Sequence, residues 1–272
     1  MQKNDDEIKE TIRKRYGTIA LQGNSDSCCM PSSSSSISSS LSACCSSGKD
    51  AIESAKSIGY QTKELASIPP ASVLGVGCGN PIKFAHIQEG DTVVDLGSGA
   101  GIDVFLAANI ARDKGKVIGV DMTDEMLQKA KENAQRHGYN NVEFRKGDIE
   151  KALPVEDNSA DAVISNCVIN LTSNKVNTFK EIYRVLKPGG LGKMVISDLV
   201  TSKEVDESTL DKDNWCSCID GALTKEHYID SIKQAGFNSV EVLDETPYLE
   251  IGDDEANGRR KITSITIKAI KE

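Results

Sequence analysis

The chain has 272 residues, of which 38% are hydrophobic, so it is long enough for one α/β domain with extensions. Its net charge of -9 and its pI near 5.0 argue against binding to a nucleic-acid backbone, which requires a basic face. Because it has no run of about 18 apolar residues and no apolar signal-peptide core at its start, we expect a cytoplasmic protein, not bound to membranes, that acts on a small molecule.

The first part of the chain predicts helices on either side of a low-complexity tract. Residues 3–16 place isolated apolar side chains among charged ones and predict a short amphipathic helix. Residues 31–47 are rich in serine and cannot bury apolar surface, so they predict a flexible linker or a mobile lid. Two cysteine pairs, Cys28–Cys29 and Cys44–Cys45, lie at the edges of this tract. A second helix is predicted over residues 49–60.

From residue 92 onward, expected strands alternate with expected helices, which predicts a mostly parallel sheet. Two strands follow the last helix directly, so we expect an antiparallel hairpin at one edge. The expected strands are 92–96, 116–121, 142–146, 160–165, 193–198, 239–243 and 262–269, and the expected helices are 104–111, 124–137, 176–186 and 225–235.

A glycine-rich turn at residues 97–101 follows the first of these strands and opens the next helix, where backbone amides can approach a ligand closely. A nicotinamide dinucleotide fingerprint would place a glycine at Ile102. Asp95 precedes the turn and would repel a pyrophosphate, but it suits a cationic or amine-bearing ligand. Asp121 ends the second strand, where it can accept ribose hydroxyls, and Asp148 follows the third, where it could bind an adenine amine.

Three cysteines fall in or beside loops that a doubly wound sheet brings to one edge, namely Cys78, Cys167 and Cys218. Taken singly, Cys167 would more often be a small core residue, and Cys216 could serve in place of Cys218. None of the cysteine spacings has the gap of two to four residues that is typical of a structural zinc site. Their joint occurrence beside a cofactor fingerprint predicts thiol chemistry. The three histidines lie in no motif typical of a catalytic base.

The acidic residues and the glycine turn together resemble the class I S-adenosylmethionine-dependent methyltransferases, and the Lys-Pro-Gly-Gly motif at 187–190 is typical of their small-molecule branch. The Gly-Cys-Gly loop at 77–79, the segment Ser-Asn-Cys-Val-Ile-Asn-Leu at 165–171 and the segment Cys-Ile-Asp-Gly-Ala at 218–222 resemble the arsenite methyltransferases. This resemblance extends to about residue 240, with Cys44–Cys45 matching a cysteine position ahead of the domain. Cys28–Cys29 has no counterpart.

The resemblance implies a Rossmann-like class I methyltransferase fold, with a seven-stranded, mostly parallel sheet, helices on both faces and an antiparallel edge strand. It divides the chain into a helical extension with the serine-rich linker (1–70), a cofactor domain (71–200) and a segment that completes the sheet and the arsenic-binding region (201–272). The implied cofactor is S-adenosylmethionine, and the residues implied to bind it are Asp95, Gly97, Ser98, Gly99, Gly101, Asp121, Met122, Met126, Gly147, Asp148, Ile149 and Asn166.

The same resemblance implies that Cys78, Cys167 and Cys218 bind trivalent arsenic, supplied as arsenite or as an arsenic-thiol conjugate. Soft thiolates select such thiophilic centres. Cys44 or Cys45 is then expected to form a disulfide with Cys78 that thioredoxin or a glutathione-type reductant recycles, in a monomer that serves arsenic detoxification. Two alternatives stay open: methylation of an organic small molecule, and a thiol-based protein that binds a metalloid or zinc without catalysis.

Overall fold

The computed structural model describes residues 2–22, 48–204, 215–251 and 259–272. The serine-rich tract and both adjacent cysteine pairs lie outside the described residues. The elements in chain order are α1 (Gln2–Gln22), α2 (Gly48–Ser57), α3 (Thr62–Ala66), η2 (Pro70–Ser72), α4 (Ile82–Ala85), β1 (Thr92–Leu96), α5 (Ile102–Ala111), β2 (Lys116–Asp121), α6 (Asp124–His137), β3 (Val142–Lys146), β4 (Ala162–Asn166), η3 (Ile169–Leu171), α7 (Lys175–Val185), β5 (Lys193–Thr201), α9 (Lys225–Gln234), β6 (Ser239–Ile251) and β7 (Arg260–Ile270).

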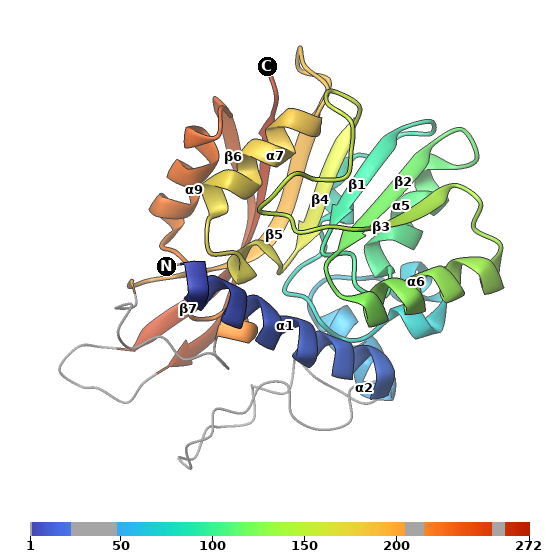
Figure 1. Ribbon diagram of the computed structural model, residues 1–272, viewed down its shortest axis with the longest axis horizontal. Helices are drawn as coiled ribbons and strands as arrows, with labels where there is room; N and C mark the ends of the chain where they lie inside the picture. The colour runs from blue at the N-terminus through green and yellow to red at the C-terminus, as the bar shows by residue number, and fades with distance from the viewer. Residues whose placement is uncertain (1, 23–47, 205–214, 252–258) are drawn as a thin grey trace.

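A single sheet in the order β3-β2-β1-β4-β5-β7-β6 runs through the molecule (Figure 1). Strands β1 to β5 pair in parallel, whereas β7 is antiparallel to both of its neighbours, β5 and β6. The mostly parallel seven-stranded sheet and the closing antiparallel hairpin are therefore as predicted. Strands β1 and β4 are neighbours although β2 and β3 come between them in the sequence. A topological switch of this kind places a binding site at the carboxyl ends of the two strands.

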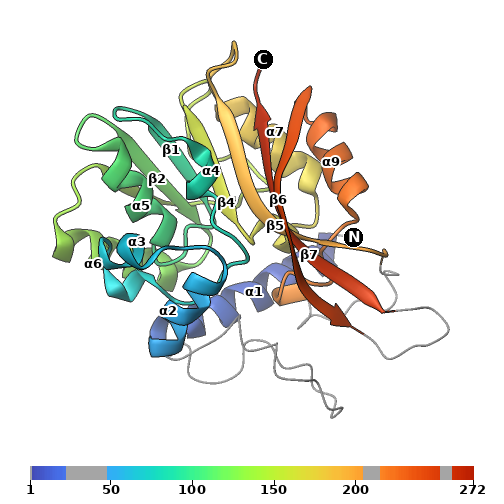
Figure 2. The ribbon, with the colours of Figure 1, turned by 180° about the vertical axis from the view of Figure 1, so that it is seen from behind.

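Helices cover both faces of the sheet because successive residues of a buried strand point to opposite sides. Val93 of β1 belongs to one apolar cluster with Phe105 of α5, and Val94 belongs to another with Ile182 of α7 and Ile232 of α9. The two views show this division, with α7 in front of the sheet in Figure 1 and α5 in front of it in Figure 2. Helix α1 crosses below the carboxyl ends of the parallel strands.

The expected elements are present, and several are longer than predicted, α1 and β6 by the most. Helix α1 continues to Gln22, because Ile19 and Ala20 pack against Met126 of α6. The pairing of β6 with β7 continues to Ile251, and register shifts at two places interrupt it. Acidic residues in the added part of β6, which are depleted in strands generally, concealed this extension from the sequence pattern.

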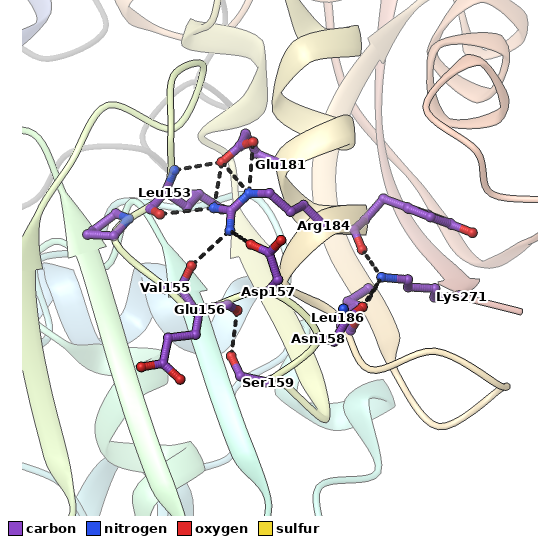
Figure 3. Close-up of polar contacts among 12 residues, drawn as sticks. Leu153, Val155, Glu156, Asp157, Asn158, Ser159, Glu181, Arg184, Leu186 and Lys271 are labelled. Carbon is purple, nitrogen blue, oxygen red and sulfur yellow. Dashed lines mark hydrogen bonds and ion pairs between the residues drawn. The ribbon is translucent and has the colours of Figure 1, made fainter.

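At the end of α7, Arg184 fixes the loop between β3 and β4 (Figure 3). Its Nη2 donates to the carbonyl oxygen of Leu153 at 3.0 Å and to Glu181 Oε2 at 2.7 Å. The backbone N–H of Leu153 donates to the same carboxylate at 2.7 Å. Lys271, just after β7, donates to Asn158 Oδ1 in the same loop at 2.7 Å. These bonds hold the loop whose first residues, 147–150, line the pocket described next.

Candidate active site

A pocket lies at the carboxyl ends of the central strands and is covered by α1. Gly101 is the one predicted cofactor residue that does not line it: a Cβ there would lie 2.7 Å from Phe105 Cε2, and its φ of 99° starts α5. The predicted cofactor residues that do line the pocket are Asp95, Gly97, Ser98, Gly99, Asp121, Met122, Met126, Gly147, Asp148, Ile149 and Asn166.

Three buried carboxyl groups, those of Asp95, Asp103 and Asp121, form the acidic floor of this pocket. Burial, followed by the charges of the other two acids, raises the pKa of Asp95 well above its usual value. Burial raises the pKa of Asp103 to about 6, although the Tyr60 hydroxyl donates to it at 2.7 Å. Asp121 accepts the backbone N–H of Gly99 at 2.9 Å, so the acid and the glycine turn are joined. Such a floor favours a positively charged ligand, whose charge would stabilise the ionised acids.

The glycine turn can hold a ligand against this floor because it has no side chains at two critical positions. Gly97 has a φ of 68°, and a Cβ on it would lie 2.4 Å from Val168 Cγ2. Gly99 has a φ of 52°, and a Cβ on it would lie 3.9 Å from Met126 Sδ, its nearest neighbour. Between them, the buried hydroxyl of Ser98 has no protein partner. An orphaned hydroxyl, a bare backbone turn and an acidic floor together fit the cationic nucleoside S-adenosylmethionine.

The cysteines that the sequence predicts as ligands converge beside this pocket. Sulfur atoms of Cys78 and Cys167 and a carboxylate oxygen of Asp198 all lie within 4.8 Å of one another. Cys218 approaches Cys167 as well, and its thiol donates to the Cys167 carbonyl oxygen at 2.9 Å. The hydrogen bond to Cys167, followed by burial, raises the pKa of the Cys218 thiol well above its usual value. The pKa of the Cys167 thiol is raised as well, so both of these thiols are protonated at neutral pH until a ligand displaces their protons.

Two of these cysteines have an unusual backbone conformation. Cys167 has a φ of 60° and Cys218 a φ of 64°, in the left-handed region that side chains other than glycine rarely adopt. The N–H of Cys167 donates to the carbonyl oxygen of Ser197 at 2.8 Å, and that of Cys218 to the carbonyl oxygen of Trp215 at 2.9 Å. Such strain concentrates at functional sites, where the surrounding structure holds it.

Asp198 and Lys175 were not identified from the sequence. Asp198 is fully buried in β5 and accepts the N–H groups of Leu199, at 2.9 Å, and Asn170, at 3.1 Å, and the hydroxyl of Tyr228, at 3.1 Å. Burial raises its pKa to about 6 and lowers the pKa of Lys175 to about 8. The signal in the sequence was an acid inside the apolar strand Val-Ile-Ser-Asp-Leu-Val.

Helix α1 forms the cover of the pocket, which the sequence predicted as a helix but did not place. Lys9 forms ion pairs with Asp148, at 2.8 Å, and with Glu150. Further along the same helix, the Tyr16 hydroxyl donates to the carbonyl oxygen of Cys216 at 3.4 Å. One helix therefore contacts both the predicted adenine-binding acid and the cysteine segment. Cys216 is itself buried and lines the pocket beside Cys218.

Comparisons with known proteins agree with this geometry. Residues 87–236 match the family model described as a methyltransferase domain. The chain is 40% identical over 273 residues to an arsenite methyltransferase of Halobacterium salinarum. This match covers 99% of this chain and 68% of the relative. It is 33% identical to an arsenite methyltransferase of Aquipseudomonas alcaligenes, over 97% of this chain and 72% of the relative.

Among solved structures, the chain resembles an arsenic (III) S-adenosylmethionine methyltransferase from Chlamydomonas reinhardtii. The TM-score is 0.61 and the sequence identity is 34%, and the match covers 81% of this chain and 73% of that one. Sequence and structure comparisons thus point to the same group of proteins.

Proposed function

The chain belongs to the arsenite methyltransferase family, a group of S-adenosylmethionine-dependent enzymes with the class I Rossmann-like fold, and from this premise we propose that it methylates trivalent arsenic bound by Cys78, Cys167 and Cys218. The observation that carries the proposal is the meeting of these thiols, from three separate segments, beside the cofactor pocket. We further propose that residues 71–200 form the cofactor domain and that residues 201–272 complete the arsenic-binding region.

The three thiols suit arsenic because soft sulfur ligands bind thiophilic centres in preference to hard cations. Each thiol that replaces a hydroxyl of arsenous acid releases its proton with that hydroxyl as water, so the charge balances without a separate base. Arsenic bound by three sulfur atoms keeps its lone pair, which is then the nucleophile. Fixing this centre beside the methyl donor accounts for most of the rate through proximity and orientation.

For the cofactor, we propose that Asp95 and the turn at 97–99 hold the methionine part and that Asp121 and Asp148 hold the nucleoside. When bound, S-adenosylmethionine supplies an electrophilic methyl group on a sulfonium. The acidic floor supports this assignment, because its carboxylates are stabilised by a ligand that carries positive charge.

Methylation leaves arsenic formally pentavalent, so two electrons must return it to the trivalent state. We propose that Cys78 and either Cys44 or Cys45 supply them by forming a disulfide, which thioredoxin or a glutathione-type reductant then reduces. Both candidates lie outside the described residues. In this scheme the protein acts as a cytoplasmic monomer in arsenic detoxification. No helix in the described part of the chain is both long enough and apolar enough to cross a bilayer.

Mass-spectrometric identification of the products tests this proposal. The protein is incubated with arsenite, S-adenosylmethionine labelled in the methyl group, and either thioredoxin with its reductase or glutathione. We expect labelled methylarsenicals from the wild type and none from Cys167→Ser or Cys218→Ser. Cys216→Ser serves as the comparison. If Cys216→Ser loses the labelled product while Cys218→Ser still forms it, Cys216 and not Cys218 is the third arsenic ligand.

Other outcomes would support the alternatives. Arsenite binding without any labelled product would indicate a sequestering protein. Transfer of label to an organic acceptor by an intact Cys167→Ser variant would indicate that the cysteines are unrelated to the reaction. For the reductive step, we expect the double variant Cys44→Ser, Cys45→Ser to lose thioredoxin-supported turnover. Unchanged turnover would rule out the proposed disulfide with Cys78.

A further inference from the structure

We propose that Asn166 is a positioning residue that fixes Cys78 beside Cys167, and that it does not bind the cofactor. This inference rests on the proposed role of both cysteines as arsenic ligands. Asn166 is the last residue of β4 and immediately precedes Cys167, so one strand end supplies a thiol and the side chain that holds the other thiol's loop.

The amide of Asn166 forms three hydrogen bonds with the backbone of the Cys78 loop. Its Oδ1 accepts the backbone N–H of Cys78 at 3.0 Å and that of Gly79 at 3.3 Å. Its Nδ2 donates to the carbonyl oxygen of Gly79 at 2.7 Å. Two N–H donors on one side and a carbonyl acceptor on the other also fix which end of the amide is oxygen.

The remaining hydrogen-bonding capacity of Asn166 is used by Tyr60. Nδ2 donates to the Tyr60 hydroxyl at 2.9 Å, and that hydroxyl donates in turn to Asp103. An amide offers two hydrogens and two lone pairs, and all four are engaged here. Although Asn166 lines the pocket, it therefore has no hydrogen-bonding group left for the cofactor. This is the reason to assign it a different role from the one that the sequence implied.

The loop that Asn166 holds has no room to move toward its neighbours. A Cβ on Gly77 would lie 3.1 Å from Asn166 Nδ2, and a Cβ on Gly79 would lie 2.6 Å from Ser197 Cβ. From β7, the Ser264 hydroxyl donates to the Cys78 carbonyl oxygen at 2.6 Å. The peptide that carries Cys78 is thus clamped from β4, β5 and β7. Two side chains supply hydrogen bonds to this peptide segment, and the Asn166 amide makes three of them whereas the Ser264 hydroxyl makes one.

Asn166→Asp tests the inference, because a carboxylate keeps the shape and the acceptors but loses both donors. Asn141→Asp is the matched control, since the Asn141 amide also donates two hydrogen bonds, to the carbonyl oxygens of Ala108 and Arg112, at a site remote from the pocket. Arsenite binding is followed through the fluorescence of Trp215, the single tryptophan, which packs in one cluster with Cys218. Binding of S-adenosylmethionine is followed by calorimetry.

We expect Asn166→Asp to weaken arsenite binding about tenfold, because two buried partners lose their donor, and not to weaken binding of S-adenosylmethionine, because an added acid beside the acidic floor does not disfavour a cationic ligand. Asn141→Asp should change neither. Unchanged arsenite binding in Asn166→Asp, or a loss confined to the cofactor, would overturn the inference. If the Cys78→Ser variant binds arsenite as tightly as the wild type does, the proposed function is contradicted instead. The two failures are therefore distinguishable.

Tyr60→Phe provides a second variant if Asn166→Asp does not fold, as judged by its thermal unfolding. It keeps the buried ring and removes the hydroxyl, which accepts one Asn166 hydrogen bond and donates to Asp103. We expect a smaller loss of arsenite affinity, of about threefold, in the same direction. If Tyr60→Phe binds arsenite as the wild type does while Asn166→Asp is unfolded, Asn166 is a general structural residue and the inference is wrong.

Discussion

At the scale of single residues, the site depends on backbone conformations that most side chains avoid. Cys167 and Cys218 are both left-handed, which costs on the order of 1 kcal/mol each relative to ordinary backbone. The hydrogen bonds from their N–H groups to Ser197 and Trp215 hold them in place. The direction of the Cα–Cβ bond of each cysteine is therefore fixed before any ligand binds.

Gly97 is a position at which a single methyl group should impair both stability and cofactor binding. A Cβ would lie 2.4 Å from Val168 Cγ2, and its φ of 68° is strained for alanine. We expect Gly97→Ala to lower the free energy of unfolding by about 2 kcal/mol and to weaken S-adenosylmethionine binding. Urea unfolding and calorimetry measure the two effects. Adding Val168→Ala should restore part of both, and no recovery would mean that strain, not the contact, is the cause.

Asp95 should make cofactor binding depend on pH. Its carboxyl group has a raised pKa, so at low pH it is protonated and cannot stabilise a cationic ligand. We expect the affinity for S-adenosylmethionine to rise with pH above the usual titration range of an aspartate, with protons released on binding. Calorimetry in buffers of different ionisation enthalpy measures both quantities. Asp95→Asn should bind weakly at every pH, and an equally steep pH dependence in that variant would exclude Asp95 as its source.

At the scale of elements, helix α1 acts as the cover of the site and is held by polar contacts at two places along its length. Lys9 contacts Asp148 and Glu150 beside the predicted adenine position, and Tyr16 contacts the segment of Cys216. Between them, Ile12 is almost fully buried in the cluster that contains Cys78 and Cys218. Any ligand that enters or leaves this pocket must therefore pass a helix whose position depends on a few contacts.

The ion pairs of Lys9 provide a direct test of this cover. Lys9→Met keeps the apolar stem but leaves Asp148 and Glu150 without their cation. We expect backbone amides of α1 to exchange several times faster with solvent, and S-adenosylmethionine to dissociate faster. Hydrogen exchange and stopped-flow fluorescence measure these rates. Arg13→Met is the control on the same helix, since Arg13 is exposed and pairs only with Glu10 among the ion pairs of the described chain. Equal effects of both variants would contradict the role of Lys9.

At the scale of the whole molecule, buried acids link stability to pH. The folded protein holds Asp103 with a pKa of about 6, whereas the unfolded chain ionises it near its usual value. The folded state therefore binds the extra proton between those values, and this group's contribution destabilises the protein as pH rises through that window.

Asp103→Asn should remove this contribution. Asparagine can still accept the Tyr60 hydroxyl and has no proton to lose. Relative to the wild type, we expect the variant to gain on the order of 2–3 kcal/mol in unfolding free energy between about pH 4 and about pH 7. Urea unfolding across this range measures the difference. A difference that does not change with pH would show that Asp103 keeps an ordinary pKa in the folded state.

The sequence predicted the sheet and the convergence of the thiols because both follow from local signals. Strands that alternate with helices pair in parallel, and the loops after parallel strands share one edge, where Cys167 follows β4 and the Cys78 segment ahead of β1 meets it. It could not place α1, because an amphipathic pattern says that one face is buried but not against what. It also missed Asp198 and the saturated amide of Asn166, since both depend on contacts between distant segments.

Strand β7 has a consequence for how the protein is made. It lies between β5 and β6, and its Ser264 holds the loop of Cys78, yet residues 260–270 are synthesised after every other strand. A growing chain on the ribosome thus carries all three soft thiols before the strand that completes their surroundings exists. Chains stalled short of residue 260 should be alkylated at Cys78 much faster than released ones. For an enzyme that meets arsenite, the interval between making the thiols and enclosing them is the time when the metalloid could capture an unfinished copy.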